Sequence, residues 1–170
     1  MHNSVSAVDP EGLLEYSVVY TDRSLNHMSQ AFQQVMRDIS QTLKQVYNAE
    51  AVAVVPGSGT YGMEAVARQF AGDKKCLIVR NGWFSFRWTQ ILDMGRIPSE
   101  TTVLKARPQS ADKQAPYAPP PIDEVVAAIH ANKPDVVFAP HVETSSGIIL
   151  SDAYMRAIAE ACLLYPSPGP

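Results

Sequence analysis

Short apolar runs of strand length alternate with longer segments of helical periodicity along most of this chain, and this alternation limits the folds open to it. The strand-like runs are Ala51–Val55, Cys76–Val79, Thr101–Leu104 and Asp135–Ala139. Continuous apolar runs joined by short connections are typical of parallel strands covered on both faces. The sequence therefore predicts an α/β fold of three layers, α-β-α, around a mostly parallel sheet.

Segments with helical spacing of apolar residues fill the intervals between these runs. They are expected at Ser29–Asn48, Met63–Ala71, Trp83–Met94, Ile122–Ala131 and from about Ser151 to Leu164. The first has one apolar stripe from Phe32 to Tyr47, which a helix facing a core explains. Two loops complete the pattern: Ala106 to Pro121, with five of the 13 prolines, and the polar segment His141–Gly147.

The two ends of the chain look different from its middle. Residues 1–28 are expected to form an N-terminal arm, in which Leu13–Tyr20 is either a short strand or an extended segment lying on another surface. Residues 29–163 form the expected domain, and residues 164–170 are a proline-rich tail. Ser29 is expected to cap the first helix.

The composition and charge of the chain exclude several classes of function. The chain has 170 residues, of which 46% are hydrophobic and 18% charged, as in globular domains. A net charge of -3 argues against general nucleic-acid binding. We expect no membrane segment and a cytoplasmic location. Cys76 and Cys162 are expected to be buried free thiols, with a disulfide as the alternative, and no metal-ligand spacing involves either.

The turn Pro56–Gly62 joins a strand-like run to a helical one and contains Ser58, Gly59 and Thr60. A glycine turn at the start of a helix collects free N–H groups at the positive end of the helix dipole, an arrangement that suits a phosphate. The spacing is neither that of a P-loop nor G-x-G-x-x-G. A tight turn with Ser or Thr as the helix cap is the alternative interpretation.

Three loops follow carboxyl ends of the expected strands: Gly57–Gly62, Asn81–Arg87 and His141–Gly147. In parallel sheets such loops meet in one crevice where ligands bind. The first offers phosphate donors, the second offers aromatic rings beside Arg87, and the third offers hydroxyls and Glu143. A planar, phosphorylated, heteroaromatic ligand would use all three.

Four segments in order resemble motifs of the class-V aminotransferases, pyridoxal-phosphate enzymes of the alanine–glyoxylate and serine–pyruvate type. His27-Met28-Ser29 with Phe32 resembles H-R-S-x-x-F, with Met28 in place of Arg. The segment from Gly57 to Ala65 resembles S-G-T/H-x-x-x-E-A, Asn81–Arg87 resembles N-G-x-[aromatic]-G-x-R, and His141–Gly147 resembles H-x-E-T/S-S/T-T-G. The resemblance implies a fold-type-I large domain.

The resemblance also implies five residues that bind pyridoxal 5'-phosphate. Ser58, Gly59 and Thr60 match the positions that hold the cofactor phosphate, Phe84 matches the ring that stacks on the pyridine, and Thr144 matches the hydroxyl that bonds the phenolic oxygen. The alternatives are that Phe84 is a core residue and that Thr144 only caps a turn.

Two further charged residues in these loops are expected to be structural. Glu143 is expected to accept hydrogen bonds from loop N–H groups and so to have a structural role rather than a catalytic one. Arg87 is expected to anchor a loop rather than to bind substrate. His141 is not expected to bind a metal.

The family implies amino transfer between a small amino acid, alanine or serine, and a 2-oxo acid, glyoxylate or pyruvate, in a homodimer. It also needs a lysine that carries the cofactor and an aspartate on the pyridine nitrogen. None of the six lysines here lies in a matching motif. We therefore expect a truncated, inactive chain with no catalytic residue. The alternatives are a non-catalytic fragment that self-associates or pairs with a full-length homologue, and a lyase or desulfurase of the same fold.

Overall fold

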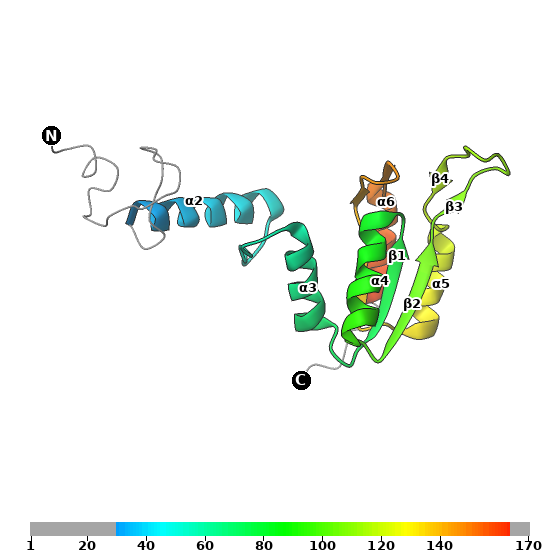
Figure 1. Cartoon of the computed structure of the whole chain (residues 1–170), viewed down its shortest axis with the longest axis horizontal. Helices are drawn as coiled ribbons and strands as arrows, with labels where there is room; N and C mark the ends of the chain where they lie inside the picture. Colours follow the sequence, from blue (N-terminus) through cyan, green and yellow to red (C-terminus); the bar gives the residue numbers. More distant parts are fainter. Residues whose placement is uncertain (1–29, 164–170) are drawn as a thin grey trace. The chain divides into compact units, whose positions relative to one another are not determined.

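The computed structural model describes residues 30–163. The expected arm, its Leu13–Tyr20 segment, the Ser29 cap, the His27-Met28 motif and the proline-rich tail lie outside the described residues. The chain divides into two compact units, residues 1–55 and 56–170. The elements, labelled in Figure 1, are α2 (Gln30–Tyr47), α3 (Gly59–Phe70), β1 (Lys75–Arg80), α4 (Trp83–Gly95), β2 (Glu100–Lys105), β3 (Arg107–Pro108), β4 (Tyr117–Ala118), α5 (Ile122–Asn132), β5 (Val136–Phe138), β6 (Val142–Glu143), β7 (Ile148–Ile149) and α6 (Asp152–Leu163).

In the first unit, α2 confirms the long helix expected from the apolar stripe. The expectation that this stripe faces a core is not met, since no described residue of α2 is buried and Val46 is 68% exposed. The strand expected at Ala51–Val55 is wrong, because these residues have no regular secondary structure. A strand needs a neighbouring strand to pair its N–H and C=O groups. The described part of this unit supplies only α2.

The second unit is built on a parallel sheet of three strands in the order β2-β1-β5. Along the central strand, Ile78 is opposite Val103 on one side and opposite Phe138 on the other. All pairs are parallel because a helix crosses over between consecutive strands, α4 from β1 to β2 and α5 from β2 to β5. The α/β class expected from the alternating runs is confirmed.

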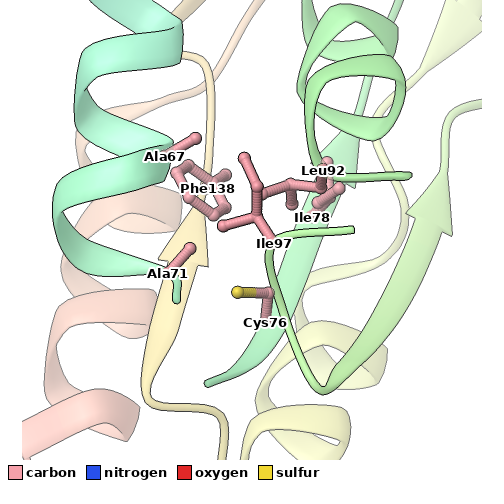
Figure 2. Packing of buried hydrophobic residues seen from close by; sticks show 7 residues of the cluster. All are labelled: Ala67, Ala71, Cys76, Ile78, Leu92, Ile97 and Phe138. Atoms are coloured by element: carbon pink, nitrogen blue, oxygen red, sulfur yellow. The ribbon is translucent and has the colours of Figure 1, made fainter. Parts of the chain in front are cut away.

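One face of the sheet packs against α3 and α4. Cys76 and Ile78 of β1 point to this face, where they lie among Ala67 of α3, Leu92 of α4 and Phe138 of β5 (Figure 2). The Trp88 and Phe138 rings stack with their centroids 4.4 Å apart. The small side chains of α3 let this helix come close to the sheet, so that it contributes to the core although most of its residues are exposed.

The opposite face packs against α5 and α6. Leu77 and Val79, which alternate with the residues of the first face, are fully buried among Val125 and Ile129 of α5 and Ile158 of α6. In Figure 1, α4 and α5 lie on opposite sides of the β1–β2 pair. Because successive side chains of a strand point to opposite faces, the continuous apolar run of β1 fills both cores. This is the three-layer arrangement expected from the sequence.

Both expected loops contain a short antiparallel pair. β3 pairs with β4 within the proline-rich segment, and β6 pairs with β7 around the turn at residues 144–147. The last helix is capped by Ser151, whose hydroxyl accepts a hydrogen bond from the N–H of Tyr154 at 3.2 Å. The β6–β7 hairpin is the part of the fold that bears on the candidate site.

Candidate functional site

The connections that follow β1 and β5 leave the sheet in opposite directions. These strands are neighbours and parallel, so their carboxyl ends meet at the same edge. The connection after β1 leads to α4 on one face, and the connection after β5 passes through the β6–β7 hairpin to α6 on the other face. Such a switch point opens a crevice in which α/β proteins bind ligands.

The carboxylate of Glu143 joins these two connections. Its Oε1 accepts hydrogen bonds from the N–H of Phe84 at 3.1 Å and from the hydroxyl of Ser145 at 2.5 Å. Its Oε2 accepts hydrogen bonds from the N–H of Ser85 at 2.8 Å and from the hydroxyl of Ser85 at 2.7 Å. Glu143 is fully buried. The expected structural role of this residue, bonding loop N–H groups, is confirmed.

Two more bonds hold the hairpin against the start of α4. The N–H of Trp83 donates to the hydroxyl of Ser145 at 2.7 Å, and the hydroxyl of Ser146 donates to the carbonyl of Asn81 at 2.8 Å. Gly82 leaves the space that this contact needs. A Cβ on Gly82 would lie 2.5 Å from the Ser145 Oγ and 2.7 Å from the Glu143 Cγ, too close for either atom.

The pKa of the Glu143 carboxyl is lowered from its ordinary value. Burial by itself raises this pKa, but the hydrogen bonds from Ser145, Ser85 and the N–H of Phe84 favour the ionised form and outweigh the burial. The first turn of α4 adds the positive end of its dipole. The carboxylate is therefore a charged cap that occupies the amino end of α4.

The start of α3 is different, because within residues 30–163 no side chain accepts a hydrogen bond from its first N–H groups. Ser58 is the N-cap residue, and its side chain makes no capping hydrogen bond, although its carbonyl accepts from the N–H of Tyr61 at 2.9 Å. Gly57 precedes it with φ +131°, a conformation that other residues rarely adopt, and a Cβ there would lie 2.8 Å from the Tyr61 ring. Gly59 is the first residue of the helix.

The hydroxyl of Thr60 links α3 to α4. It accepts a hydrogen bond from the Arg87 guanidinium, with 2.7 Å between Nη1 and Oγ1. Arg87 was expected to anchor a loop; it lies within α4 instead, and this contact anchors the first turn of α3 to that helix. Both residues line a groove of about 450 Å³ between the two helices, together with Glu64, Arg68, Gln90, Ile91, Met94 and Gly95.

The structure brings the three predicted loops into contact, but the first, Gly57–Gly62, does not follow a strand as expected, because Ala51–Val55 is not a strand. Thr60 in the first loop accepts a hydrogen bond from Arg87 in the second. Phe84, about one helical turn before Arg87, donates to Glu143 in the third loop, and Thr144 is the next residue after Glu143. Phe84 is 48% exposed, so the alternative that it is a core residue does not apply within the described part of the chain. Thr144 is exposed in the hairpin turn. The groove beside Thr60 is lined by neither Phe84 nor Thr144.

Sequence reasoning missed two residues of this region. Ser85 bonds the N–H groups of Asn81 at 2.8 Å and of Gly82 at 3.0 Å while it donates to Glu143. Ser85 lies three residues after the N-cap residue Gly82, a position from which polar side chains often bond the start of a helix, and this spacing could have identified it. Asn81 is 3% exposed, and neither polar atom of its side chain has a hydrogen-bond partner in the described structure. No pattern in the sequence indicated that the Asn81 side chain is buried in this way.

Residues 30–163 contain neither a metal-binding cluster nor a membrane-spanning helix. No group of three or more His, Cys, Asp or Glu side chains in this range is arranged to hold a metal ion. No helix in this range is both long enough and apolar enough to cross a membrane.

Comparison with known proteins gives a likeness of fold. No family model matches the sequence, and no curated protein matches it. Among solved structures, the chain is similar to a ureidoglycine–glyoxylate aminotransferase from Bacillus subtilis, with a TM-score of 0.65 and 22% sequence identity. The match covers 82% of this chain but 34% of that protein, so the chain spans about a third of its length. The α/β fold expected from the sequence is thus the fold of part of an aminotransferase.

Proposed function

We propose that this chain is the cofactor-binding part of a class-V aminotransferase that uses pyridoxal 5'-phosphate. The whole protein would move an amino group between a small amino acid, such as alanine or serine, and a 2-oxo acid, such as glyoxylate or pyruvate, as a cytoplasmic homodimer. The likeness of fold to an aminotransferase supports the general activity. The four sequence motifs support the class, the cofactor and the substrates.

The observation that carries this proposal is the difference between two helix starts beside the sheet. The amino end of α4 is already occupied by the Glu143 carboxylate. The amino end of α3 begins at Ser58, whose side chain caps nothing. A phosphate that binds a helix start here therefore has α3 available, where backbone N–H groups and the dipole favour negative charge.

The side chains at this helix start fit a phosphate. The Thr60 hydroxyl accepts from Arg87, so its own proton remains available to donate to a phosphate oxygen. The guanidinium of Arg87 adds positive charge beside the same hydroxyl. Ser58, Gly59 and Thr60 would hold the phosphate in this assignment.

The remaining two predicted residues would contact the ring of the cofactor. Phe84 offers a half-exposed aromatic face, and Thr144 offers a hydroxyl on the neighbouring hairpin. When bound, pyridoxal phosphate supplies the electron-withdrawing ring on which amino groups are exchanged. We assign no catalytic residue to this chain, since none of its lysines lies in the family's lysine motif.

The proposal is tested by measuring the binding of pyridoxamine 5'-phosphate, which cannot condense with surface lysines, and of pyridoxamine. The phosphate ester should bind and pyridoxamine should bind at least tenfold more weakly, because the phosphate subsite supplies a charge-assisted set of bonds. The double variant Ser58→Ala, Thr60→Val should lose this preference, whereas Ser110→Ala, in the β3–β4 connection, should keep it. Equal affinity for both compounds in the unaltered chain would contradict the phosphate assignment.

A non-catalytic protein that self-associates is the second candidate function. The observation that favours it is the exposed apolar stripe of α2, where Val35 is 41% and Ile39 40% exposed. Light scattering during size-exclusion chromatography distinguishes the candidates. A monomer that binds pyridoxamine 5'-phosphate favours the first, and a dimer or larger species that does not bind it favours the second.

A further inference from the structure

We propose that Glu143 is a positioning residue for the two ring contacts of the candidate cofactor site. The inference rests on the proposed function and goes beyond the structural role expected for this residue. Its carboxylate bonds the N–H of Phe84 directly, and the next residue along the hairpin is Thr144. The two residues proposed to contact the ring thus lie on either side of a single buried side chain.

The contact links segments that are otherwise independent. Phe84 belongs to the first turn of α4, on the connection after β1, and Thr144 belongs to the hairpin after β5. These connections lead to opposite faces of the sheet, so the helix packing of one does not fix the position of the other. The bonds among Glu143, Ser145 and residues 83–85 join them across about 60 residues of chain.

The geometry makes the contact specific for a carboxylate. Each oxygen of Glu143 accepts two hydrogen bonds, and every partner is a donor. An amide in the same place would present an NH₂ group to donors, so that at least one N–H or O–H would lose its partner inside the protein. The absence of a side chain on Gly82 supplies the space, because a Cβ there would overlap both Ser145 and Glu143.

A positioning role and a merely stabilising role give different results with different ligands. The phosphate is proposed to bind at Ser58–Thr60, which Glu143 does not touch, whereas the ring is proposed to bind at Phe84 and Thr144. Loss of the Glu143 carboxylate should therefore weaken binding of the ring and leave binding of phosphate alone unchanged. A variant that is only less stable would weaken both or neither.

The test compares Glu143→Gln with Glu100→Gln, which makes the same change at an exposed carboxylate on β2. Affinities for pyridoxamine 5'-phosphate and for inorganic phosphate are measured by titration followed in NMR spectra. In Glu143→Gln, the affinity for pyridoxamine 5'-phosphate should fall about tenfold, the effect of losing a hydrogen bond to a charged group, and that for phosphate should not change. Equal losses for both ligands, or no loss, would overturn the proposal.

Amide hydrogen exchange provides a second readout that needs no ligand. In Glu143→Gln, the amides of residues 83–85 and of residues 142–149 should exchange faster together, while those of β1 stay protected. If the unaltered chain binds neither ligand, the proposed function fails and the positioning role fails with it. If it binds both ligands but the hairpin of Glu143→Gln exchanges at unchanged rates, the positioning role alone is refuted. If Glu143→Gln does not fold, Ser145→Ala decides, since it removes one donor to Oε1 and should give the same pattern with smaller changes.

Discussion

Ser85 donates two hydrogen bonds to the same oxygen of Glu143, one from its backbone N–H at 2.8 Å and one from its hydroxyl at 2.7 Å. Both residues are buried, at 1% and 0% exposure. The pair fastens the hairpin after β5 to the first turn of α4, and it places a negative charge at the positive end of that helix. The amino end of α4 is thereby used within the protein, which is the reason that we propose the amino end of α3 as the site for an outside anion.

Glu143→Gln should lower the free energy of unfolding by about 1–3 kcal/mol at pH 7, because the amide cannot accept all four hydrogen bonds that the carboxylate accepts. Chemical unfolding followed by circular dichroism measures this change. Glu100→Gln, at an exposed carboxylate, should change the free energy by roughly 0.5 kcal/mol or less. Equal changes in the free energy of unfolding for the two substitutions would show that the buried hydrogen bonds of Glu143 do not contribute extra stability.

The contribution of Glu143 to stability should depend on pH. Its pKa is lowered in the folded protein, chiefly because the hydrogen bonds from Ser145 and Ser85 outweigh the effect of burial, so folding favours the ionised form. The stabilisation is present above the ordinary pKa of a glutamate and is lost as the pH falls through the lower folded value. The difference in stability between the unaltered chain and Glu143→Gln should therefore shrink in acid. A difference that stays constant from neutral pH to about pH 3 would contradict this assignment.

Gly82→Ala should destabilise the protein by about 1–3 kcal/mol, since the added Cβ would lie 2.5 Å from the Ser145 Oγ and would push the hairpin away from α4. Gly62→Ala is the matched control. A Cβ on Gly62, within α3, meets no atom within 4 Å, and the substitution should stabilise the helix by roughly 0.5–1 kcal/mol. Thermal unfolding of both variants measures the two effects, which should have opposite signs.

Phe84→Leu should weaken cofactor binding much more than it lowers the stability of the protein. Phe84 is 48% exposed, so the substitution should lower the free energy of unfolding by about 1 kcal/mol or less. It should weaken binding of pyridoxamine 5'-phosphate by about threefold to tenfold, because leucine has no flat face to stack on the ring. Tyr117→Leu, which makes a similar change at a 55% exposed position on β4, should leave the affinity unchanged. An unaltered affinity in Phe84→Leu would remove this residue from the proposed site.

Cys76 should resist alkylation until the protein unfolds. The thiol is 2% exposed, and burial, together with the nearby charge of Asp135, raises its pKa to about 11. At pH 8 iodoacetamide should label it more slowly than a free thiol, at a rate set by unfolding. Because the folded protein favours the neutral thiol, this contribution to stability is lost as the pH rises from about 9 to about 11. Rapid labelling of Cys76 in the native protein, detected by mass spectrometry, would contradict the buried position.

The part of the fold that local patterns control was predictable. The apolar run at Cys76–Val79 became β1, and the helical stripes became α2, α4 and α5 within a few residues of the expected bounds. The structural role of Glu143 also followed, because a buried charge between packed elements needs hydrogen-bond partners. Arg87 was expected to anchor a loop, whereas it joins two helices. The roles of Ser58, Gly59, Thr60, Phe84 and Thr144 in binding stay predictions.

Other features depended on neighbours far away in the chain. Ala51–Val55 has the composition of a strand, but a strand forms only where another strand pairs with it. Whether Phe84 is buried or half exposed depends on which elements cover α4, and Glu143, the carboxylate partner of Ser85, lies 58 residues further along the chain. No local pattern contains that information.

The sequence by itself determined the order and type of the central elements and the layered α/β class, because hydrophobic periodicity and glycine turns act over a few residues. Only the tertiary structure decided that the hairpin after β5 caps α4, whereas the Ser58 side chain makes no capping hydrogen bond at the start of α3. The reason is that capping by Glu143 requires two connections from neighbouring parallel strands to meet at one edge, and the distance between them is set by the packing of the sheet.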